Sequence, residues 1–392
     1  MLKNKLLIIF FIINILLYFK IIIIYKLDFQ LKNNENNEEI KNIEKNLRKI
    51  INYKLYENIH KYDKIEQPKI SVVISVFNGE GYLRRTLYSI QNQDFKDIEI
   101  IMIDDGSKDK SVKLIKKLMN RDKRIKLYQN DYNKGALYTK ANGMLKAKGK
   151  YVMLMDEDDM YVQEDAFTTI YNEIEKQNVD MLSFGLLMKF VNNGNEIFYK
   201  NFETPIIFQP EILNNMYNIT DKNEVIRTGG ILVNYIFKTE LAVKSIKEIE
   251  DKYLNSKINF HDDLFIFFVI IRNACSLKRI KRIFYFVLIE NNNSLDQLRL
   301  FRLNEKRKNN FNLVCFAFIN YLEFLLNHTQ NSFIDKKIAS SELKTWYLNF
   351  KCKTNNSTRI IGNNLLYLYL NNKFIENKVK LEILDFLKSQ KK

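Results

Sequence analysis

Apolar residues are unevenly distributed along the 392-residue chain, and they are densest near its start. Residues 6–25 are almost all Leu, Ile, Phe and Tyr. As a helix they would extend about 30 Å, enough to cross the hydrocarbon core of a bilayer. Residues 18–35 contain no Ala, Gly or Ser, so the small-residue site that a signal peptidase cleaves is missing. The pattern predicts an uncleaved transmembrane anchor over residues 1–26, with a cleaved signal peptide as the alternative.

A polar stretch follows the predicted anchor. Residues 27–67 are rich in Asn, Glu and Lys. Within them, apolar residues recur at helical spacing at Ile43, Leu47, Ile50 and Ile51. We interpret residues 27–67 as a stem with some helix, a spacer between the membrane and the folded domain.

The orientation of the anchor is not decided by its flanking lysines, because they occur on both sides of the apolar segment. Sequons for N-glycosylation lie downstream at Asn218, Asn292, Asn327, Asn355 and Asn356. These sequons fit a lumenal catalytic part. We therefore expect a single-pass membrane protein of the Golgi or ER, with its catalytic domain in the lumen.

From Pro68 onward, short apolar runs alternate with segments of helical period. Strands are expected at residues 70–77, 98–103, 125–128, 151–155, 181–184 and 283–289, and helices around residues 83–90, 112–118, 137–144 and 167–174. Ser107 is placed to cap the second of these helices. Alternation at short intervals predicts an α/β domain with a mainly parallel sheet.

Three of the expected strands end in polar or acidic clusters, namely 78–80, 104–106 and 156–159. Ligands of open α/β sheets bind beyond the carboxyl ends of the strands. These three clusters should therefore face one crevice. Each cluster alone is also explained as a solvated turn or helix cap, but the ordered set favours a ligand site.

Clustered carboxylates repel one another unless a cation or protons join them. Oxygen ligands select hard cations such as Mg²⁺ or Mn²⁺, which commonly bridge the phosphates of a nucleotide. A carboxylate at a strand end also accepts hydrogen bonds from ribose hydroxyls or a base N–H. Gly79 and Gly106 would let the backbone approach such a ligand closely. The crevice is thus suited to a nucleoside diphosphate with a divalent cation.

At this point the chain resembles the family 2 glycosyltransferases, which have the GT-A fold. The resemblance covers about residues 68–185. It rests on the segments PKISVVISVFN (68–78), IDDGS (103–107), NKG (133–135) and GKYVMLMDEDD (149–159). It implies a GT-A type nucleotide-binding domain over residues 68–294 and inverting transfer of a sugar from a nucleoside-diphosphate sugar, most often a UDP-sugar. It also implies Mn²⁺ or Mg²⁺ as cofactor.

The resemblance assigns roles to particular residues. The nucleotide-binding residues it implies are Ser75, Phe77, Asn78, Glu80, Asp104, Asp105 and Asp156. Among them, Asp105 would bind the base and Asp104 would support that loop. Asp156 and Asp158 would hold the metal, with Glu157 at the tolerant middle position of the motif.

Inverting transfer needs a general base that takes the proton of the acceptor hydroxyl. The family supplies it from an acidic pair at the start of a helix, which matches His261-Asp262-Asp263 here. Asp263 would be the catalytic base, and Asp262 and His261 would lie on the acceptor side. A helix cap is the alternative. Asn234 matches the acceptor-side segment, although Val233 and Tyr235 depart from the family's usual Trp and Lys.

Residues 295–392 fall beyond the resemblance and are expected to form a helical extension. Residues 313–325 suggest an amphipathic helix packed on the catalytic domain. The extension has no second long apolar span and no Gln-x-x-Arg-Trp motif. Both absences favour transfer of a single hexosyl or N-acetylhexosaminyl group to a hydroxyl of a glycan, protein or lipid over polymer synthesis. The alternative is a non-catalytic nucleotide-binding subunit of a glycosylation complex.

The formal net charge is +16, yet lysine is scattered through a chain also rich in Asn and Ile. That distribution indicates a composition bias rather than a nucleic-acid-binding patch, so no nucleic-acid partner is expected. The cysteines, at 275, 315 and 352, lack metal-site spacing and are expected to be buried thiols.

Overall fold

The computed structural model describes residues 37–51, 61–190, 196–200, 203–209, 211–219, 225–227, 231–259, 262–289, 320–321 and 324–325. The predicted anchor, His261 and most of the predicted extension lie outside these residues. Within the described part of the chain, no helix is long and apolar enough to cross a membrane. The chain divides into two compact units, residues 1–53 and 54–392.

The first unit contributes one described helix, α2 (Asn37–Ile51), inside the predicted stem. Ile43, Leu47 and Ile50 are buried and recur at the spacing of one helix face. The helix expected from the apolar period of the stem is therefore present.

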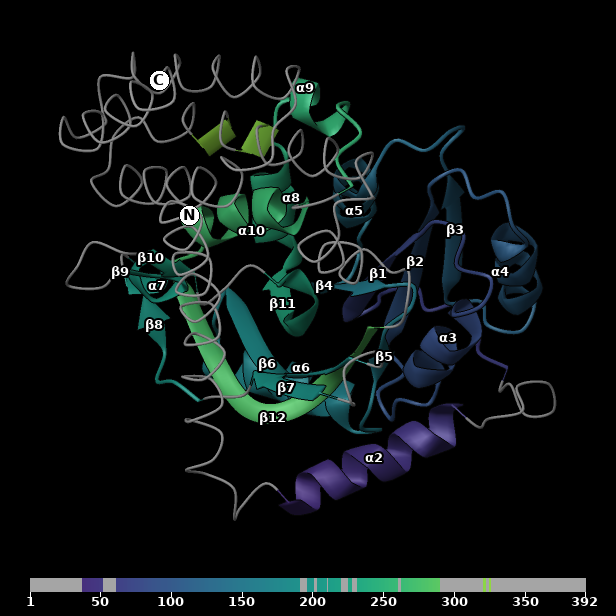
Figure 1. Cartoon of the computed structure of the whole chain (residues 1–392), viewed down its shortest axis with the longest axis horizontal. Coiled ribbons are helices and arrows are strands. Elements are labelled where there is room, and N and C mark those ends of the chain that lie inside the picture. Colours follow the sequence, from purple (N-terminus) through teal and green to yellow (C-terminus); the bar gives the residue numbers. More distant parts are fainter. Residues whose placement is uncertain are drawn as a thin grey trace, which may run out of the picture. The chain divides into compact units, whose positions relative to one another are not determined.

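The second unit contains the α/β domain (Figure 1). Its first elements are β1 (Ile70–Val76), α3 (Leu83–Gln91), β2 (Ile98–Asp104), α4 (Ser111–Met119), β3 (Ile125–Gln129), α5 (Ala136–Leu145), β4 (Tyr151–Asp156), β5 (Met160–Tyr161), α6 (Ala166–Gln177) and β6 (Met181–Phe190). The later elements are β7 (Glu196–Lys200), β8 (Ile207–Phe208), α7 (Glu211–Met216), β9 (Tyr217–Ile219), β10 (Val225–Arg227), η1 (Leu232–Asn234), β11 (Tyr235–Lys238), α8 (Thr239–Ile246), α9 (Asp251–Leu254), α10 (Asp262–Asn273) and β12 (Ser276–Ile289).

The main sheet has the strand order β3-β2-β1-β4-β11-β6-β12-β5. The first four strands are parallel, as the alternation of strand and helix predicts. Strand β11 then pairs antiparallel with both β4 and β6, and β5 pairs antiparallel with β12. The expectation of a mainly parallel sheet is therefore corrected to a mixed sheet, because β11 enters it in the opposite direction.

Helices cover both faces of this sheet, and the side chains of β1 show why. Ile70, Val72 and Ile74 point into one apolar core with α3, α4 and α6, whereas Val73 points into another with α5, α8 and α10. Successive side chains of a strand face opposite sides, so a strand buried on both faces is apolar throughout. Figure 1 shows α5, α8 and α10 gathered on one side of the sheet.

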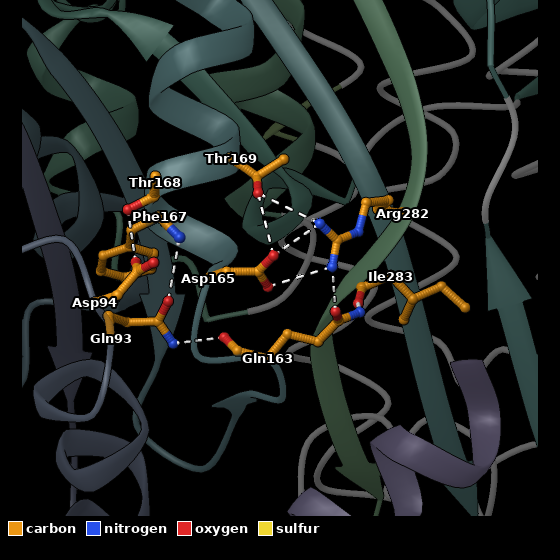
Figure 2. Close-up of polar contacts among 9 residues, drawn as sticks. All are labelled: Gln93, Asp94, Gln163, Asp165, Phe167, Thr168, Thr169, Arg282 and Ile283. Atoms are coloured by element: carbon orange, nitrogen blue, oxygen red, sulfur yellow. Dashed lines mark hydrogen bonds and ion pairs between the residues drawn. The ribbon is translucent and has the colours of Figure 1, made fainter. Parts of the chain in front are cut away.

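Strand β12 bends along its length (Figure 1), and its register against β6 shifts on both sides of Ile283. A polar cluster holds this irregular point against the start of α6 (Figure 2). Arg282 donates to Asp165 at 2.8 Å, and Gln163 donates to the Ile283 carbonyl. The backbone carbonyl of Gln163 in turn accepts a hydrogen bond from the Gln93 side chain at 2.9 Å. The cluster fixes β12 just before Tyr285, a residue that reappears in the site.

Three local expectations need correction or completion. Helix α4 begins at Ser111, and Asp109 accepts bonds from the Ser111 amide and hydroxyl, so Ser107 does not cap this helix. Cys275 is exposed rather than buried. Of the predicted 313–325 helix, Tyr321 and Phe324 are described, and both rings pack against Phe265 of α10.

Candidate active site

The carboxyl ends of β2, β1 and β4 lie side by side at one edge of the sheet. In the parallel ladders Val76 is opposite Asp104, and Ser75 is opposite Asp156. The Ser75 hydroxyl donates to the Asp156 carboxylate at 3.4 Å. The polar clusters at these strand ends thus converge, as the sequence predicts.

The acidic turn at 156–159 is held from two sides. From α3, Arg85 donates to the Asp158 carbonyl at 3.2 Å and Thr86 donates to the Glu157 carbonyl at 2.7 Å. From β12, the Tyr285 hydroxyl donates to the Asp159 carboxylate at 2.8 Å and accepts a bond from the Asp156 amide at 3.3 Å. The turn is therefore fixed in position, so its carboxylates are presented as a set.

Lys140 of α5 connects this turn to the start of α10. Its ammonium nitrogen lies 3.1 Å from Asp156 Oδ1, 2.9 Å from Asp262 Oδ2 and 2.8 Å from Asp263 Oδ1. The Lys140 side chain is only 7% exposed. Burial by itself lowers the pKa of this lysine, but the three carboxylates outweigh it and hold the pKa well above its usual value. Lys140 is therefore a charged bridge between the donor-side acid and the predicted base.

The sequence reasoning missed Lys140, although a signal was present. Leu137, Ala141 and Met144 form the buried face of α5, and Lys140 lies at the same i, i+3, i+4, i+7 spacing. A lysine on the apolar face of a helix requires a buried counter-charge. That anomaly identifies a candidate site residue without any family resemblance.

The start of α5 depends on Gly135, which sets the direction of Lys140. Its φ is +99°, and a Cβ there would lie 2.8 Å from the Ile258 backbone nitrogen. Ala136 then donates to the Asn259 side chain at 3.1 Å. Only glycine fits this close approach, which packs the start of α5 against the segment that leads into α10.

The environment of Asp263 suits a base that works near neutral pH. The pKa of this carboxyl is raised to about 7, mainly by burial. The positive charge of Lys140 lowers the pKa, and the charges of Asp262 and Asp156 raise it. Efficient general bases have a pKa close to the working pH. The position of Asp263 at the start of α10 also agrees with the helix-cap alternative, but a cap alone does not require contact with Lys140.

The carboxyls of the acidic turn compete for protons. Burial and the neighbouring acids raise the pKa of Asp158 to about 6 and that of Glu157 to about 8. Burial also raises the pKa of Asp159 well above its usual value. Each carboxylate makes its neighbours harder to ionise. A divalent cation would relieve this repulsion, so the donor set fits a hard metal ion.

Among the residues that the structure describes, no three acidic, His or Cys side chains already form a metal cage. Mg²⁺ does not need one, because it is usually bound by one or two carboxylates together with water and substrate phosphates. Asp156 and Asp158 are the residues that would hold such an ion.

The two aspartates at the end of β2 have different surroundings. Both oxygens of Asp105 accept bonds from one loop: the side chain of Asn130 at 2.8 Å and the backbone amides of Lys134 at 2.7 Å and Gly135 at 2.9 Å. Asp104 is also buried, but its Oδ1 has no hydrogen-bond partner in the described structure. The geometry thus gives Asp105 the hydrogen bonds that support this loop and leaves a buried acceptor atom of Asp104 unpaired. The role of base contact implied for Asp105 stays a prediction.

Replacing Asp105 with alanine separates these two roles. The change leaves one buried and two partly buried donors without their acceptor, so we expect the free energy of unfolding to fall by roughly 3 kcal/mol. Chemical denaturation checks this value, and calorimetry with UDP measures nucleotide affinity. A variant of unchanged stability that no longer binds UDP would instead identify Asp105 as the direct base contact.

The other predicted nucleotide contacts lie on the loop after β1. Phe77 is 44% exposed at the end of the strand. Asn78, with φ of 56°, accepts a bond from the Lys108 amide at 2.8 Å, and Glu80 accepts one from the Lys110 amide at 3.2 Å. In this structure Asn78 and Glu80 join the β1–α3 loop to the β2–α4 loop, and Phe77 is the exposed apolar surface beside them.

The predicted acceptor-side residues do not share one location in the structure. Asp262 is buried and contacts Lys140, whereas His261 lies outside the described residues. Asn234 is fully buried in η1, where it donates to the Phe184 carbonyl at 2.8 Å and to the Ser183 hydroxyl at 3.2 Å. This placement gives Asn234 a structural role between β6 and β11 rather than a surface for an acceptor.

Comparison with known proteins agrees with this geometry. Residues 71–231 match the sequence profile described as glycosyl transferase family 2. An uncharacterized glycosyltransferase of Haemophilus influenzae is 35% identical over 34% of this chain and 52% of its own length. The GalNAc(5)-diNAcBac-PP-undecaprenol beta-1,3-glucosyltransferase of Campylobacter jejuni is also 35% identical, over 35% of this chain and 44% of its own length.

Solved structures extend the similarity in fold beyond the matched segment. The crystal structure of S. aureus TarS 1–349 in complex with UDP-GlcNAc has a TM-score of 0.57 at 18% identity, covering 79% of this chain and 82% of that one. The chain spans about half the length of the curated relatives described above, or less. The profile match, these relatives and the shared fold confirm the resemblance seen in the sequence. Residues 71–231 therefore carry the sequence pattern of glycosyl transferase family 2.

Proposed function

We propose that this protein transfers a single sugar from a UDP-sugar to an acceptor hydroxyl, with inversion at the anomeric carbon and with Mn²⁺ or Mg²⁺ as cofactor. The observation that carries the proposal is the position of Lys140. One ammonium group touches both Asp156 of the donor-side turn and Asp263 of the predicted base. The two halves that a transfer reaction needs are thus within one ion-pair network.

The reaction assigns one task to each side of this network. The Asp263 carboxylate takes the proton of the acceptor hydroxyl while that oxygen attacks the anomeric carbon. The bond from the anomeric carbon to the diphosphate oxygen breaks, and UDP leaves with the bonding electrons. Asp156 and Asp158 would hold a divalent cation, which would neutralise the charge of the diphosphate. Lys140 adds a fixed positive charge beside Asp156.

The choice of donor and acceptor is supported by similar proteins. TarS has been solved with UDP-GlcNAc and with UDP, and both contain the nucleotide we propose here. The Campylobacter relative is named for a lipid-linked glycan acceptor. A hydroxyl on a glycan carried by a lipid is therefore the first acceptor class to examine.

Replacing Asp158 with asparagine tests the metal-dependent part of this proposal. We expect metal-stimulated release of UDP from UDP-GlcNAc, UDP-glucose or UDP-galactose to fall roughly 100-fold, since one charge-stabilising group is lost. Calorimetric titration with Mn²⁺ in the presence of UDP gives a second readout that does not depend on turnover. Asp97→Asn, a change to an exposed aspartate after α3, is the matched control.

Two outcomes would contradict the proposal. UDP binding without any turnover over the donor set would favour a non-catalytic nucleotide-binding subunit. Turnover that is equal with Mn²⁺ and with a chelator would remove the metal from the reaction.

A further inference from the structure

Helix α4 and the turns at its two ends carry a dense set of positive charges. Seven basic residues between positions 108 and 123 are exposed: Lys108, Lys110, Lys113, Lys116, Lys117, Arg121 and Lys123. The opposite face of α4, formed by Leu114, Ile115 and Leu118, is buried against the sheet. Its outer face is therefore a basic surface, called the α4 face below.

The described acids nearest to α4 have other partners or pair only weakly with it. The Asp109 carboxylate accepts hydrogen bonds from the backbone amides of Ser111 and Glu80. Asp122 is fully buried, and its Oδ2 lies 2.8 Å from the Arg124 guanidinium. Lys110 lies 3.8 Å from Glu80, a weak and exposed pair. Within the described part of the chain, Lys113 and Lys116 have no ion pair at all. The charges of Lys113 and Lys116 are thus exposed to the solvent.

Other surface helices of the described domain do not share this pattern. Helix α6 carries Glu173 and Glu175 beside Lys176. Around α8 and α9, Lys244 and Lys247 alternate with acids at 240, 248, 250 and 251. The even distribution of lysine expected from the composition therefore does not hold on α4, where basic residues are concentrated.

The position of the α4 face in the domain is informative. At its carboxyl end the incoming chain docks: the Tyr62 amide donates to the Arg121 carbonyl at 3.0 Å, and the Lys123 amide donates to the Tyr62 carbonyl at 2.8 Å. At its amino end Lys108 and Lys110 bond the loop after β1, beside the donor crevice. Figure 1 shows α4 outside β3, at the edge of the domain.

We infer that the α4 face binds the anionic surface of a membrane. Lysines near such a surface each contribute to attraction that falls off within a Debye length. The exposed residues of α4 include no aromatic side chain, so the stacking platforms typical of single-stranded nucleic-acid sites are missing. The face also adjoins Tyr62, close to the start of the described part of the second unit.

Lysine footprinting of the full-length chain tests this inference residue by residue. The protein is mixed with phosphatidylcholine vesicles or with vesicles that also contain phosphatidylglycerol, and is then treated with a water-soluble acylating reagent. We expect acylation of Lys113 and Lys116 to slow about five-fold on the anionic vesicles at low salt. Lys244 and Lys247 are internal controls that should stay equally reactive. High salt should remove the protection.

Charge removal gives an independent check. In the triple variant Lys113→Gln, Lys116→Gln and Lys117→Gln, protection of Lys123 should be lost, because most of the attraction is gone. The charge-matched variant Lys244→Gln, Lys247→Gln and Lys257→Gln should keep the protection. Equal acylation of Lys113 on neutral and anionic vesicles would overturn the inference. Protection by a soluble oligonucleotide or acidic protein, but not by anionic vesicles, would also overturn it. UDP release is measured in parallel and is expected to be unchanged by either variant.

Discussion

Asparagine in place of Asp263 is expected to lower the rate of sugar transfer roughly 1,000-fold, within the range for loss of a general base. Asparagine keeps the shape of the side chain and its contact with Lys140 but cannot take the acceptor proton. The Kd for UDP should change little, because the carboxylate acts on the acceptor hydroxyl. Initial rates with saturating donor, together with calorimetry, separate these two quantities.

The dependence of the rate on pH gives a second signature of Asp263. Its pKa is raised to about 7, mainly by burial, with Lys140 lowering it and Asp262 and Asp156 raising it. Because the base acts in its deprotonated form, the wild-type rate should rise through about pH 7 to a plateau. The asparagine variant should lack this rise.

Asp262→Asn is the matched control for that experiment, since Asp262 touches the same ammonium group at 2.9 Å. If Asp262 only balances the charge of Lys140, its replacement should reduce the rate far less than that of Asp263. A larger loss at Asp262 than at Asp263 would transfer the role of base to the first acid of the pair.

The half of the fold that binds the donor could be predicted from local pattern. Strands β1, β2 and β4 are mostly apolar because both of their faces are covered, although β2 also buries Glu99. Their polar clusters lie at the carboxyl ends of the strands or just beyond them. Parallel strands place those ends at one edge, so the crevice followed directly.

The other half of the sheet could not be predicted in the same way. Strands β5 and β11 have only 2 and 4 residues, too few for a periodic signal to appear. Direction is also not encoded in an apolar run, because β11 is buried like β4 yet is antiparallel to it. Only the packed structure shows that the sheet is mixed.

Some features of the site residues could likewise be predicted from local sequence, whereas others depend on packing. That Asp104 and Asp105 lie at a strand end was evident from sequence, but which of them meets the loop at 130–135 depends on the direction of each side chain at the end of β2. Lys140 contacts Asp263, which is 123 residues away in the chain. Such partners are set by the packing of α5 against α10, which no local pattern contains.

Replacing Lys140 with methionine is expected to reduce the rate of transfer about 100-fold to 1,000-fold, the range seen when one preorganised charge-stabilising group is removed. Methionine preserves much of the volume of the side chain but not its charge. Asp156, Asp262 and Asp263 would then face one another without a cation in the free enzyme. Lys140→Arg keeps the charge and should retain part of the activity, whereas Lys146→Met, on the turn after α5, should behave like wild type.

A role confined to stability would predict a different set of results. Lys140 lowers the pKa of Asp263 in the wild type, so its removal should move the rise in rate to higher pH. Rates measured above that rise would then recover part of the loss at neutral pH. A rate reduced equally at every pH, with no shift of the profile, would leave Lys140 as a structural residue only.

The free energy of unfolding of the Lys140→Met variant should also depend on pH. Without Lys140, the buried acids have folded-state pKa values above their unfolded values, so the folded chain binds more protons than the unfolded chain. The free energy of unfolding then falls as pH rises, until those folded-state values are passed. At pH 8 we expect Lys140→Met to be less stable than wild type by roughly 3 kcal/mol, because a buried pair has lost one partner. At pH 5, where the acids take up protons, the gap should narrow, and denaturant titrations at both pH values measure it. A gap that does not narrow would mean that lost packing, rather than unpaired charge, explains the effect of the substitution.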